Sequence, residues 1–243
     1  MQLFLEPNFT FSSTSISINA VESRHIVKVL RKQAGDELVL TNGKGLLATG
    51  VLINAHPKNC ILAVTNIQEK TPSISYLHIA IAPTKANDRF EWFLEKATEI
   101  GIQEITPLLC EHSERRIIKL ERYQKVLQAA MKQSLSPFLP KLNDLTSFSD
   151  FVSTPTTPSP DNAVKSKFNK CIAHCEDQPK EKLFQLIGSH NLILIGPEGD
   201  FSTSEIDLAL KKGFKAVSLS NSRLRTETAG IVACHTANLI PDL

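Results

Sequence analysis

The chain has 243 residues, of which 42% are hydrophobic and 21% are charged, and its formal net charge is +2. This composition is that of a globular protein, excludes a disordered or fibrous chain, and leaves room for a small domain beside a medium one. The small net charge does not by itself indicate a nucleic-acid partner, so any such surface has to come from local basic clusters.

The cysteines and the hydrophobic stretches indicate the compartment. An odd number of scattered cysteines without a C-x-x-C pair argues against both a disulfide framework and a zinc site, so we expect reduced thiols and no metal. The first ten residues lack a basic segment followed by an apolar run, and no apolar stretch approaches the ~20 residues that span a bilayer. We therefore expect a soluble, cytoplasmic protein.

Residues 1–72 are predicted to form a small β-rich domain, most simply a barrel. Alternating or continuous apolar patterns predict strands at 15–18, 37–40, 46–54 and 61–64, and Asn42-Gly43 between two of them is a hairpin signal. A helix is expected at residues 22–31, and the domain is expected to end near Thr71 and Pro72.

Residues 73–243 alternate between strand and helix patterns. Strands are expected at 76–82, 104–109, 172–174, 191–195 and 215–220, and helices at 88–100, 119–135, 180–187, 202–213 and 226–240. Asp88 is the expected N-cap of the first helix and Gly101 its end, and Ser202 with Glu205 forms a capping box. Residues 147–162, rich in Ser, Thr and Pro, are expected to be a surface loop. This alternation predicts a mainly parallel sheet covered on both faces.

Two loops stand where ligands bind in such sheets, at the carboxyl ends of strands. Residues 196–200 (Gly-Pro-Glu-Gly-Asp) follow one strand, and residues 221–225 (Asn-Ser-Arg-Leu-Arg) follow the last one. Thr226 is expected to cap the final helix, whose free N–H groups would face the same cleft. Each loop alone also fits an ordinary turn, but the two together favour a site. No G-x-G-x-x-G or Walker A motif supports a dinucleotide or P-loop site.

The residues of these loops resemble a known signature. Residues 194–199 (Leu-Ile-Gly-Pro-Glu-Gly) and 219–229 (Leu-Ser-Asn-Ser-Arg-Leu-Arg-Thr-Glu-Thr-Ala) are similar to the C-terminal motifs of the bacterial 16S ribosomal RNA uridine N3-methyltransferases, of the SPOUT superfamily. The resemblance extends over nearly the whole chain, through Lys85, Arg89, Glu91, residues 95–101, residues 105–107, Glu111, Gln133, Ser134, Pro140, His25, residues 29–31, Gly35, Asp36, Gly43 and Gly45.

The resemblance implies an N-terminal PUA-like β-barrel that binds RNA (residues 1–72) and a C-terminal trefoil-knotted α/β SPOUT domain (residues 73–243) that binds S-adenosylmethionine and forms a homodimer. It also implies contacts to that cofactor from a set of residues in the two loops and one histidine upstream: Ile195, Gly196, Gly199, Leu219, Ser220, Leu224, Arg225, Thr226 and His174. His174 fits equally an ordinary histidine at a strand end.

The implied reaction assigns further roles. Arg225 is expected to stabilise the charge that develops on the uracil when N3 loses its proton, and Glu198 or Glu227 is the candidate base. Glu227 also fits a carboxylate that only stabilises the start of its helix. Ribosomal RNA of the small subunit is the expected partner, with phosphate contacts from basic residues that also fit a solvated surface: Arg24, Arg31, Lys85, Arg89, Arg115 and Arg116. His25 and Trp92 are expected to serve packing, Trp92 among Phe90, Phe93 and Leu94 of one helix.

Three departures from the family pattern stand out. Asp200 replaces a usual glycine, residues 220–222 (Ser-Asn-Ser) replace Leu-Gly-Pro, and Ser136 with Pro137 stands where an arginine is expected, a role that Arg115 and Arg116 are hypothesised to fill. Two other functions stay open: a non-catalytic RNA-binding protein of the same fold, and a Rossmann-like enzyme of small-molecule metabolism.

Overall fold

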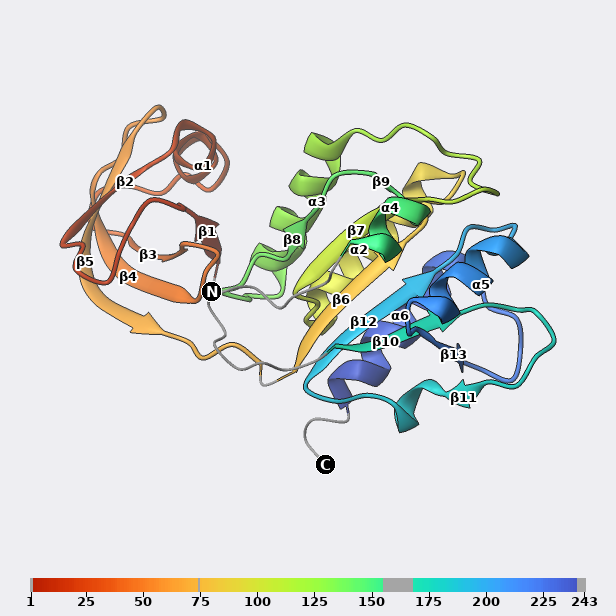
Figure 1. Cartoon of the computed structure of the whole chain (residues 1–243). Helices are drawn as coiled ribbons and strands as arrows, with labels where there is room; N and C mark the ends of the chain where they lie inside the picture. Colours follow the sequence, from red (N-terminus) through yellow and green to blue (C-terminus); the bar gives the residue numbers. More distant parts are fainter. Residues whose placement is uncertain (1, 74, 155–167, 240–243) are drawn as a thin grey trace. The chain divides into compact units, whose positions relative to one another are not determined.

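The computed structural model describes residues 2–73, 75–154 and 168–239, which divide into two compact units (Figure 1). The first unit comprises Met1–Pro72 and Gln128–Leu139, and the second comprises Ser73–Leu127 and Pro140–Leu243. The expected boundary after residue 72 coincides with the first division, but the segment Gln128–Leu139 packs with the first unit. It does so because the loop after Thr41 holds it: Gly45 N donates to Pro137 O, and Leu139 N donates to Gly43 O.

The first unit is built on a five-stranded sheet in the order β1-β3-β4-β5-β2. The bounds are β1 Leu3–Leu5, β2 Ser15–Ile18, β3 Glu37–Thr41, β4 Leu46–Asn54 and β5 Cys60–Glu69. All four predicted strands are confirmed, and β1 was missed because three consecutive buried residues show no alternation. In the described residues the edge strands β1 and β2 do not pair with each other, so the predicted barrel is a half-barrel.

The helix of the first unit starts earlier than expected. Asn19 caps α1 (Ala20–Arg24), since its side-chain oxygen accepts from the N–H groups of Val21 and Glu22. The helix continues as a π-helical turn over His25–Val29, and the chain leaves it at Arg31 with φ of 58°. Ile26 on this turn is fully buried against the sheet, and the expected packing of His25 is confirmed by its edge contact with the Phe4 ring.

The second unit is an α/β domain around an eight-stranded parallel sheet. Its strands follow the order β11-β13-β10-β12-β6-β7-β8, with β9 paired to β7. The bounds are β6 Tyr76–Ile81, β7 Glu104–Leu109, β8 Lys141–Leu142, β9 Thr146–Ser147, β10 Asn169–Ala173, β11 Glu181–Lys182, β12 His190–Ile195 and β13 Lys215–Ser218. The five predicted strands are confirmed. The three two-residue strands were missed because they are too short to carry a period.

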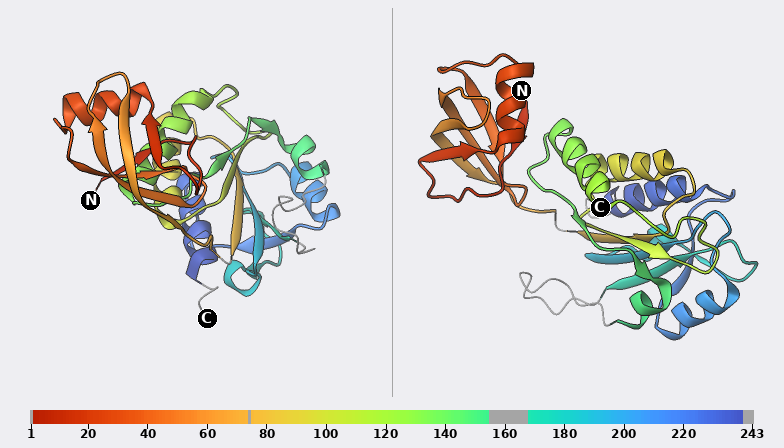
Figure 2. Two further views of the ribbon diagram at one scale, coloured as in Figure 1. Left: turned by 90° about the vertical axis from the view of Figure 1, so that its left-hand side faces the viewer. Right: turned by 90° about the horizontal axis from the view of Figure 1, so that it is seen from above.

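Helices cover both faces of this sheet, as predicted (Figure 2). The bounds are α2 Asn87–Ile100, α3 Leu120–Gln133, α4 Phe148–Ser153, α5 Thr203–Lys211 and α6 Thr226–Leu239. Helices α4 and α5 pack with the core that contains Ala80, Leu108 and Leu194, whereas α6 packs on α2 and β6. A Cβ built on Gly230 of α6 would meet the Phe93 ring at 2.6 Å and Ile81 at 2.9 Å, so glycine permits this close approach.

Several predicted helix ends are confirmed and others are wrong. Gly101 ends α2 in the left-handed conformation, and Ser202 with Glu205 forms the capping box of α5. Asp88 is not the N-cap of α2: that position is Ala86, which has no side-chain acceptor, and Asp88 lies in the first turn.

Two further segments differ from the prediction. Residues 180–187 are not an α-helix but the short strand β11 followed by the 3-10 turn Leu183–Gln185, because β13 offers a free edge for pairing. The Ser-rich stretch 147–162 was expected to be a loop, but its start forms α4, capped by Ser147, whose side-chain oxygen accepts from Asp150 N. Residues 155–162 of that prediction lie outside the described residues. No helix in the described part of the chain is long and apolar enough to span a membrane.

Candidate active site

A cavity of about 550 Å³ opens at the carboxyl ends of β10, β12 and β13. Its walls are the loops that follow these three strands, so both loops singled out in the sequence meet in one place. Of the nine residues expected to contact a cofactor, eight line this cavity: His174, Ile195, Gly196, Leu219, Ser220, Leu224, Arg225 and Thr226. The ninth, Gly199, lies outside the lining and faces His112, whose Cβ would be 3.0 Å from an added Cβ.

A buried hydrogen bond joins the two loops. Thr226 Oγ1 donates to the carbonyl oxygen of Gly196 over 3.0 Å. The expectation that Thr226 caps α6 is therefore wrong: Thr226 is the first residue of the helix, and its hydroxyl donates across the cavity wall instead of accepting from the helix. The bond fixes the spacing between the start of α6 and the turn after β12.

Asp200 closes the turn after β12 in place of the usual glycine. Its φ is 63°, a left-handed conformation that aspartate tolerates better than most side chains. Its carboxylate accepts from its neighbour Phe201 N at 2.8 Å and from Cys175 N at 2.6 Å. The aspartate thus keeps the turn that a glycine would form and also ties it to the loop after β10.

His174 is the polar group of the cavity wall that most clearly points to a ligand. It is 7% exposed, and neither ring nitrogen has a hydrogen-bond partner among the described residues. Burial lowers the pKa of His174, and the charge of Lys180 acts in the same direction. A neutral imidazole offers one donor and one acceptor, so a polar ligand in the cavity would satisfy two groups that are costly to leave unpaired.

The two candidate bases, Glu198 and Glu227, line different spaces. Glu198 lines the cavity, where its Oε1 accepts from Lys85 N at 2.9 Å. Glu227 lines a second hollow of about 710 Å³, which shares the wall formed by residues 223–225 with the cavity. The Glu227 side chain is 9% exposed, its Oε1 lies 4.0 Å from Arg89 Nε, and its Oε2 has no hydrogen-bond partner in the described residues.

Arg225 lies between these two spaces. It lines both, it is exposed, and its guanidinium forms no hydrogen bond or ion pair with the residues that the structure describes. A permanently charged guanidinium without a partner in the described residues can contact a ligand in either space. Trp92, expected to serve packing, is 43% exposed and lines the second hollow.

The basic residues expected to contact RNA differ in exposure and in whether other residues already pair with their side chains. Arg24 and Arg31 are exposed on the first unit, and Arg116 is exposed on the second. Lys85 Nζ is paired with Glu114 at 2.6 Å, and Arg89 faces Glu227. Arg115 is half-buried and donates to two backbone carbonyls, Thr84 O at 2.9 Å and Lys85 O at 2.5 Å. Arg115 therefore holds a loop, whereas Arg116 is available to a partner.

Comparison with known proteins identifies the family. The family model described as "RNA methyltransferase domain" matches residues 71–238, and the model described as "RNA methyltransferase PUA domain" matches residues 18–65. The chain belongs to this RNA methyltransferase family. Ribosomal RNA small subunit methyltransferase E of Rickettsia conorii is 31% identical over 227 residues, covering 89% of this chain and 86% of that protein.

Solved structures of RNA methyltransferases agree with this assignment. The crystal structure of a probable rRNA-methyltransferase from Porphyromonas gingivalis matches with a TM-score of 0.84 and 40% identity, covering 98% of both chains. A putative methyltransferase from Legionella pneumophila, in complex with the bound cofactor SAM, matches with a TM-score of 0.79 and 26% identity over 96% of this chain and 94% of that one. The family and two-domain fold expected from the sequence are confirmed, and the Rossmann-like alternative is wrong.

Proposed function

We propose that this RNA methyltransferase moves a methyl group from S-adenosylmethionine to N3 of a uridine in the 16S ribosomal RNA of the small subunit. The observation that carries the proposal is the cavity closed by the Thr226–Gly196 hydrogen bond, with His174 in its wall lacking a hydrogen-bond partner among the described residues. Support also comes from the relatives: the Rickettsia conorii protein is a ribosomal RNA small subunit methyltransferase, and the Legionella pneumophila structure holds SAM.

The cavity fits this cofactor in size and chemistry. Pockets for ligands of this size usually measure roughly 300–1,000 Å³, and the cavity measures about 550 Å³. Ile195, Leu219 and Leu224 offer apolar contacts for a flat base. The His174 nitrogens, which have no partner in the described part of the chain, offer a donor and an acceptor to polar groups of the cofactor.

The residues of this chain mainly position the two reactants and stabilise the charge that develops on the uracil. When bound, S-adenosylmethionine supplies a methyl group already activated by its sulfonium, so acceleration comes mostly from alignment with N3. The Thr226–Gly196 bond keeps the two loops at a fixed spacing for that alignment. Arg225 offsets the negative charge on the carbonyl oxygens beside N3 as its proton leaves. Glu198 and Glu227 are the candidate proton acceptors. Glu198 already accepts a hydrogen bond from Lys85 N, whereas Glu227 Oε2 has no partner in the described residues.

Further parts of the proposal concern assembly and location. The 3-10 turn Leu183–Gln185, in the connection between β10 and β12, contacts α6. We propose that α6 is threaded through this connection as a trefoil knot and that the protein acts as a homodimer. Because its substrate is ribosomal RNA, it acts in the cytoplasm. Arg24, Arg31, Lys85 and Arg116 contact RNA phosphates, and Arg89 contacts the RNA from its position beside Glu227.

The function is tested on small-subunit ribosomal RNA from a strain that lacks the gene. We expect calorimetry to detect S-adenosylmethionine binding without RNA, and mass mapping to find one uridine that gains a methyl group at N3 when the purified protein is added. Binding of RNA without any methyl transfer would support the non-catalytic alternative. Methylation of another atom would overturn the assignment to N3 while leaving the cofactor assignment intact.

A further inference from the structure

The second hollow, which we call the base pocket, shares residues 223–225 with the cavity as part of its wall. Its wall includes Arg89 and Trp92 of α2, Arg225 of the loop and Glu227 of α6. Leu224 and Arg225 line both spaces, so a molecule in the base pocket would lie against the same loop as one in the cavity. This common wall is where two reactants can be brought together.

Glu227 places a nearly buried carboxylate in the wall of the base pocket. A carboxylate that is 9% exposed is expensive to hold without hydrogen bonds, yet Oε2 has none in the described residues. Arg89 Nε is 4.0 Å from Oε1, which gives charge compensation but not a hydrogen bond. The free oxygen therefore calls for a donor from a ligand.

The hydrogen-bonding groups in the wall of the base pocket complement the pairing edge of uracil. The pairing edge of uracil carries an N–H donor at N3 between two carbonyl acceptors. The base pocket offers the reverse, a carboxylate acceptor in Glu227 and guanidinium donors in Arg89 and Arg225. Cytosine has an acceptor at N3 and would leave Glu227 facing a lone pair, a mismatch that discriminates strongly in sites built from hydrogen bonds.

Trp92 supplies an apolar surface at the same place. It lies one helical turn from Arg89, so both side chains project from the same side of α2. Its side chain is 43% exposed, and nucleobases stack readily on such rings.

We propose that the base pocket receives the target uracil, with Glu227 as the base that takes the N3 proton and Trp92 as the stacking surface; this rests on the proposed function. A bond forms from N3 to the methyl carbon while the sulfur–carbon bond breaks, and its electron pair stays on sulfur. The N3 proton passes to the Glu227 carboxylate and from there to water. Arg89 and Arg225 offset the charge on the two uracil oxygens.

The first experiment compares Glu227→Gln with the matched control Glu95→Gln, a carboxylate of α2 that pairs with Lys96. Glu227→Gln is expected to bind S-adenosylmethionine within about 3-fold of the wild type and to lose turnover by at least ~10²-fold, because general-base catalysis contributes that much. The limb of the pH–rate profile that reports base ionisation should disappear with it. Glu95→Gln should behave as the wild type.

The second experiment uses Trp92, the single tryptophan of the chain, as a probe. Its fluorescence should change more on adding the unmodified ribosomal RNA than on adding the same RNA already methylated at N3, which lacks the donor for Glu227. Trp92→Leu should lower kcat/KM by roughly 5- to 100-fold through loss of base stacking, and Trp92→Phe should restore most of it. The Trp92 substitutions also cover the case in which Glu227→Gln does not fold.

The outcomes separate the two proposals. If the wild-type protein fails to methylate N3 of any uridine, the proposed function fails. If it does methylate N3, but Glu227→Gln keeps full turnover or Trp92→Leu keeps full kcat/KM, only the base pocket is overturned.

Discussion

The hydroxyl of Thr226 donates a 3.0 Å hydrogen bond to the carbonyl oxygen of Gly196. This contact links residues 30 positions apart and fastens the start of α6 to the turn after β12, so one buried bond sets the geometry of the cavity between them.

Replacing Thr226 with valine keeps the shape of the side chain and removes the donor. The carbonyl of Gly196 then lacks its partner, and we expect the free energy of unfolding to fall by about 1–3 kcal/mol. Affinity for S-adenosylmethionine should fall as well, because the loop spacing relaxes. Urea unfolding and calorimetry measure both effects. Thr226→Ser keeps the hydroxyl and should stay close to the wild type, and equal behaviour of the two variants would contradict this role.

Arg225→Ala tests charge stabilisation in the proposed reaction. The guanidinium is exposed and has no partner among the described residues, so its removal should leave the fold and the cofactor affinity nearly unchanged. Turnover should fall by at least ~10²-fold, a usual loss for one donor to a developing negative charge. Arg225→Lys, which keeps the charge without the planar fork, should fall in between. Full activity of Arg225→Ala would end the proposal.

Substitutions at Asp200 separate backbone strain from hydrogen bonding. Alanine at φ of 63° pays a steric cost of roughly 1–2 kcal/mol and also loses the carboxylate bonds to Phe201 N and Cys175 N. Glycine avoids the steric cost and loses the bonds, with a smaller further cost of about 0.5–1 kcal/mol from the greater freedom of the unfolded chain. We therefore expect melting temperatures in the order wild type, Asp200→Gly, Asp200→Ala. A more stable alanine variant than glycine variant would show that the left-handed turn is not the dominant factor.

Arg115 and Arg116 should respond differently to removal. Arg116→Ala should reduce the slope of log K for RNA binding against log salt by about 1, the change expected for one phosphate contact, with no change in unfolding. Arg115→Ala should lower the unfolding free energy instead, since the carbonyls of Thr84 and Lys85 lose their donors. The same salt slope for Arg116→Ala and the wild type would remove Arg116 from the RNA surface.

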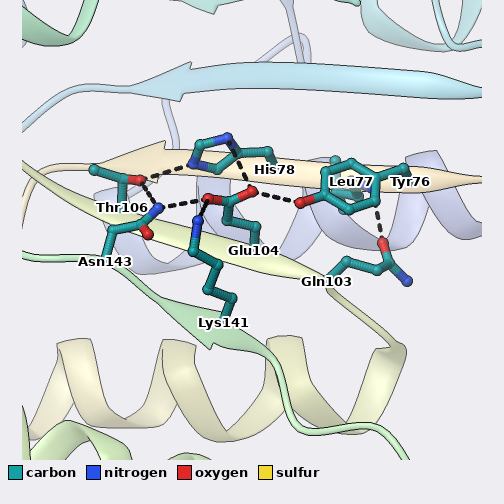
Figure 3. A network of polar contacts seen from close by, with 8 residues as sticks. All are labelled: Tyr76, Leu77, His78, Gln103, Glu104, Thr106, Lys141 and Asn143. Atoms are coloured by element: carbon teal, nitrogen blue, oxygen red, sulfur yellow. Dashed lines mark hydrogen bonds and ion pairs between the residues drawn. The ribbon is translucent and has the colours of Figure 1, made fainter. Parts of the chain in front are cut away.

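A partly buried polar network at the amino ends of β6, β7 and β8 predicts acid sensitivity (Figure 3). Glu104 accepts from Tyr76 OH, from Asn143 at 2.7 Å and from Lys141 at 2.9 Å, and His78 Nε2 lies 2.8 Å from Thr106 Oγ1. Burial lowers the pKa of His78 from 6.5 to about 4. Burial by itself would raise the pKa of Glu104, but His78 and these hydrogen bonds outweigh it and lower the pKa from 4.5 to about 2.

The lowered pKa values of His78 and Glu104 both make the folded protein less stable as the pH falls. The unfolded chain takes up a proton at His78 below pH 6.5 and at Glu104 below pH 4.5, whereas the folded chain resists until about 4 and about 2. Stability should therefore fall as the pH drops from about 6.5, and further below about 4.5. Urea unfolding at several pH values, followed by Trp92 fluorescence, measures this. His78→Gln should flatten the curve between pH 6.5 and 5, and an unchanged slope would exclude His78 as its cause.

Local pattern was enough to determine most of the fold and the place of the site. The apolar strand at residues 191–195 and the glycine- and arginine-rich loops are short-range features, because strand periodicity and turn chemistry depend on neighbouring residues. Their position after strands of a parallel sheet predicted that residues such as Gly196 and Arg225 would share one cavity. The resemblance of the same loops to known motifs supplied the family.

Only the tertiary structure decided which polar groups are paired. The sequence could not reveal that Thr226 donates to Gly196 or that Glu198 accepts from Lys85. Nor could it reveal that Glu227 and His174 hold buried atoms with no hydrogen-bond partner within the described ranges. It also could not tell that Trp92 is half-exposed or that Arg115 is occupied by backbone carbonyls. These facts depend on contacts between residues far apart in the chain, and burial and hydrogen bonding at such contacts are set by packing that no local pattern encodes.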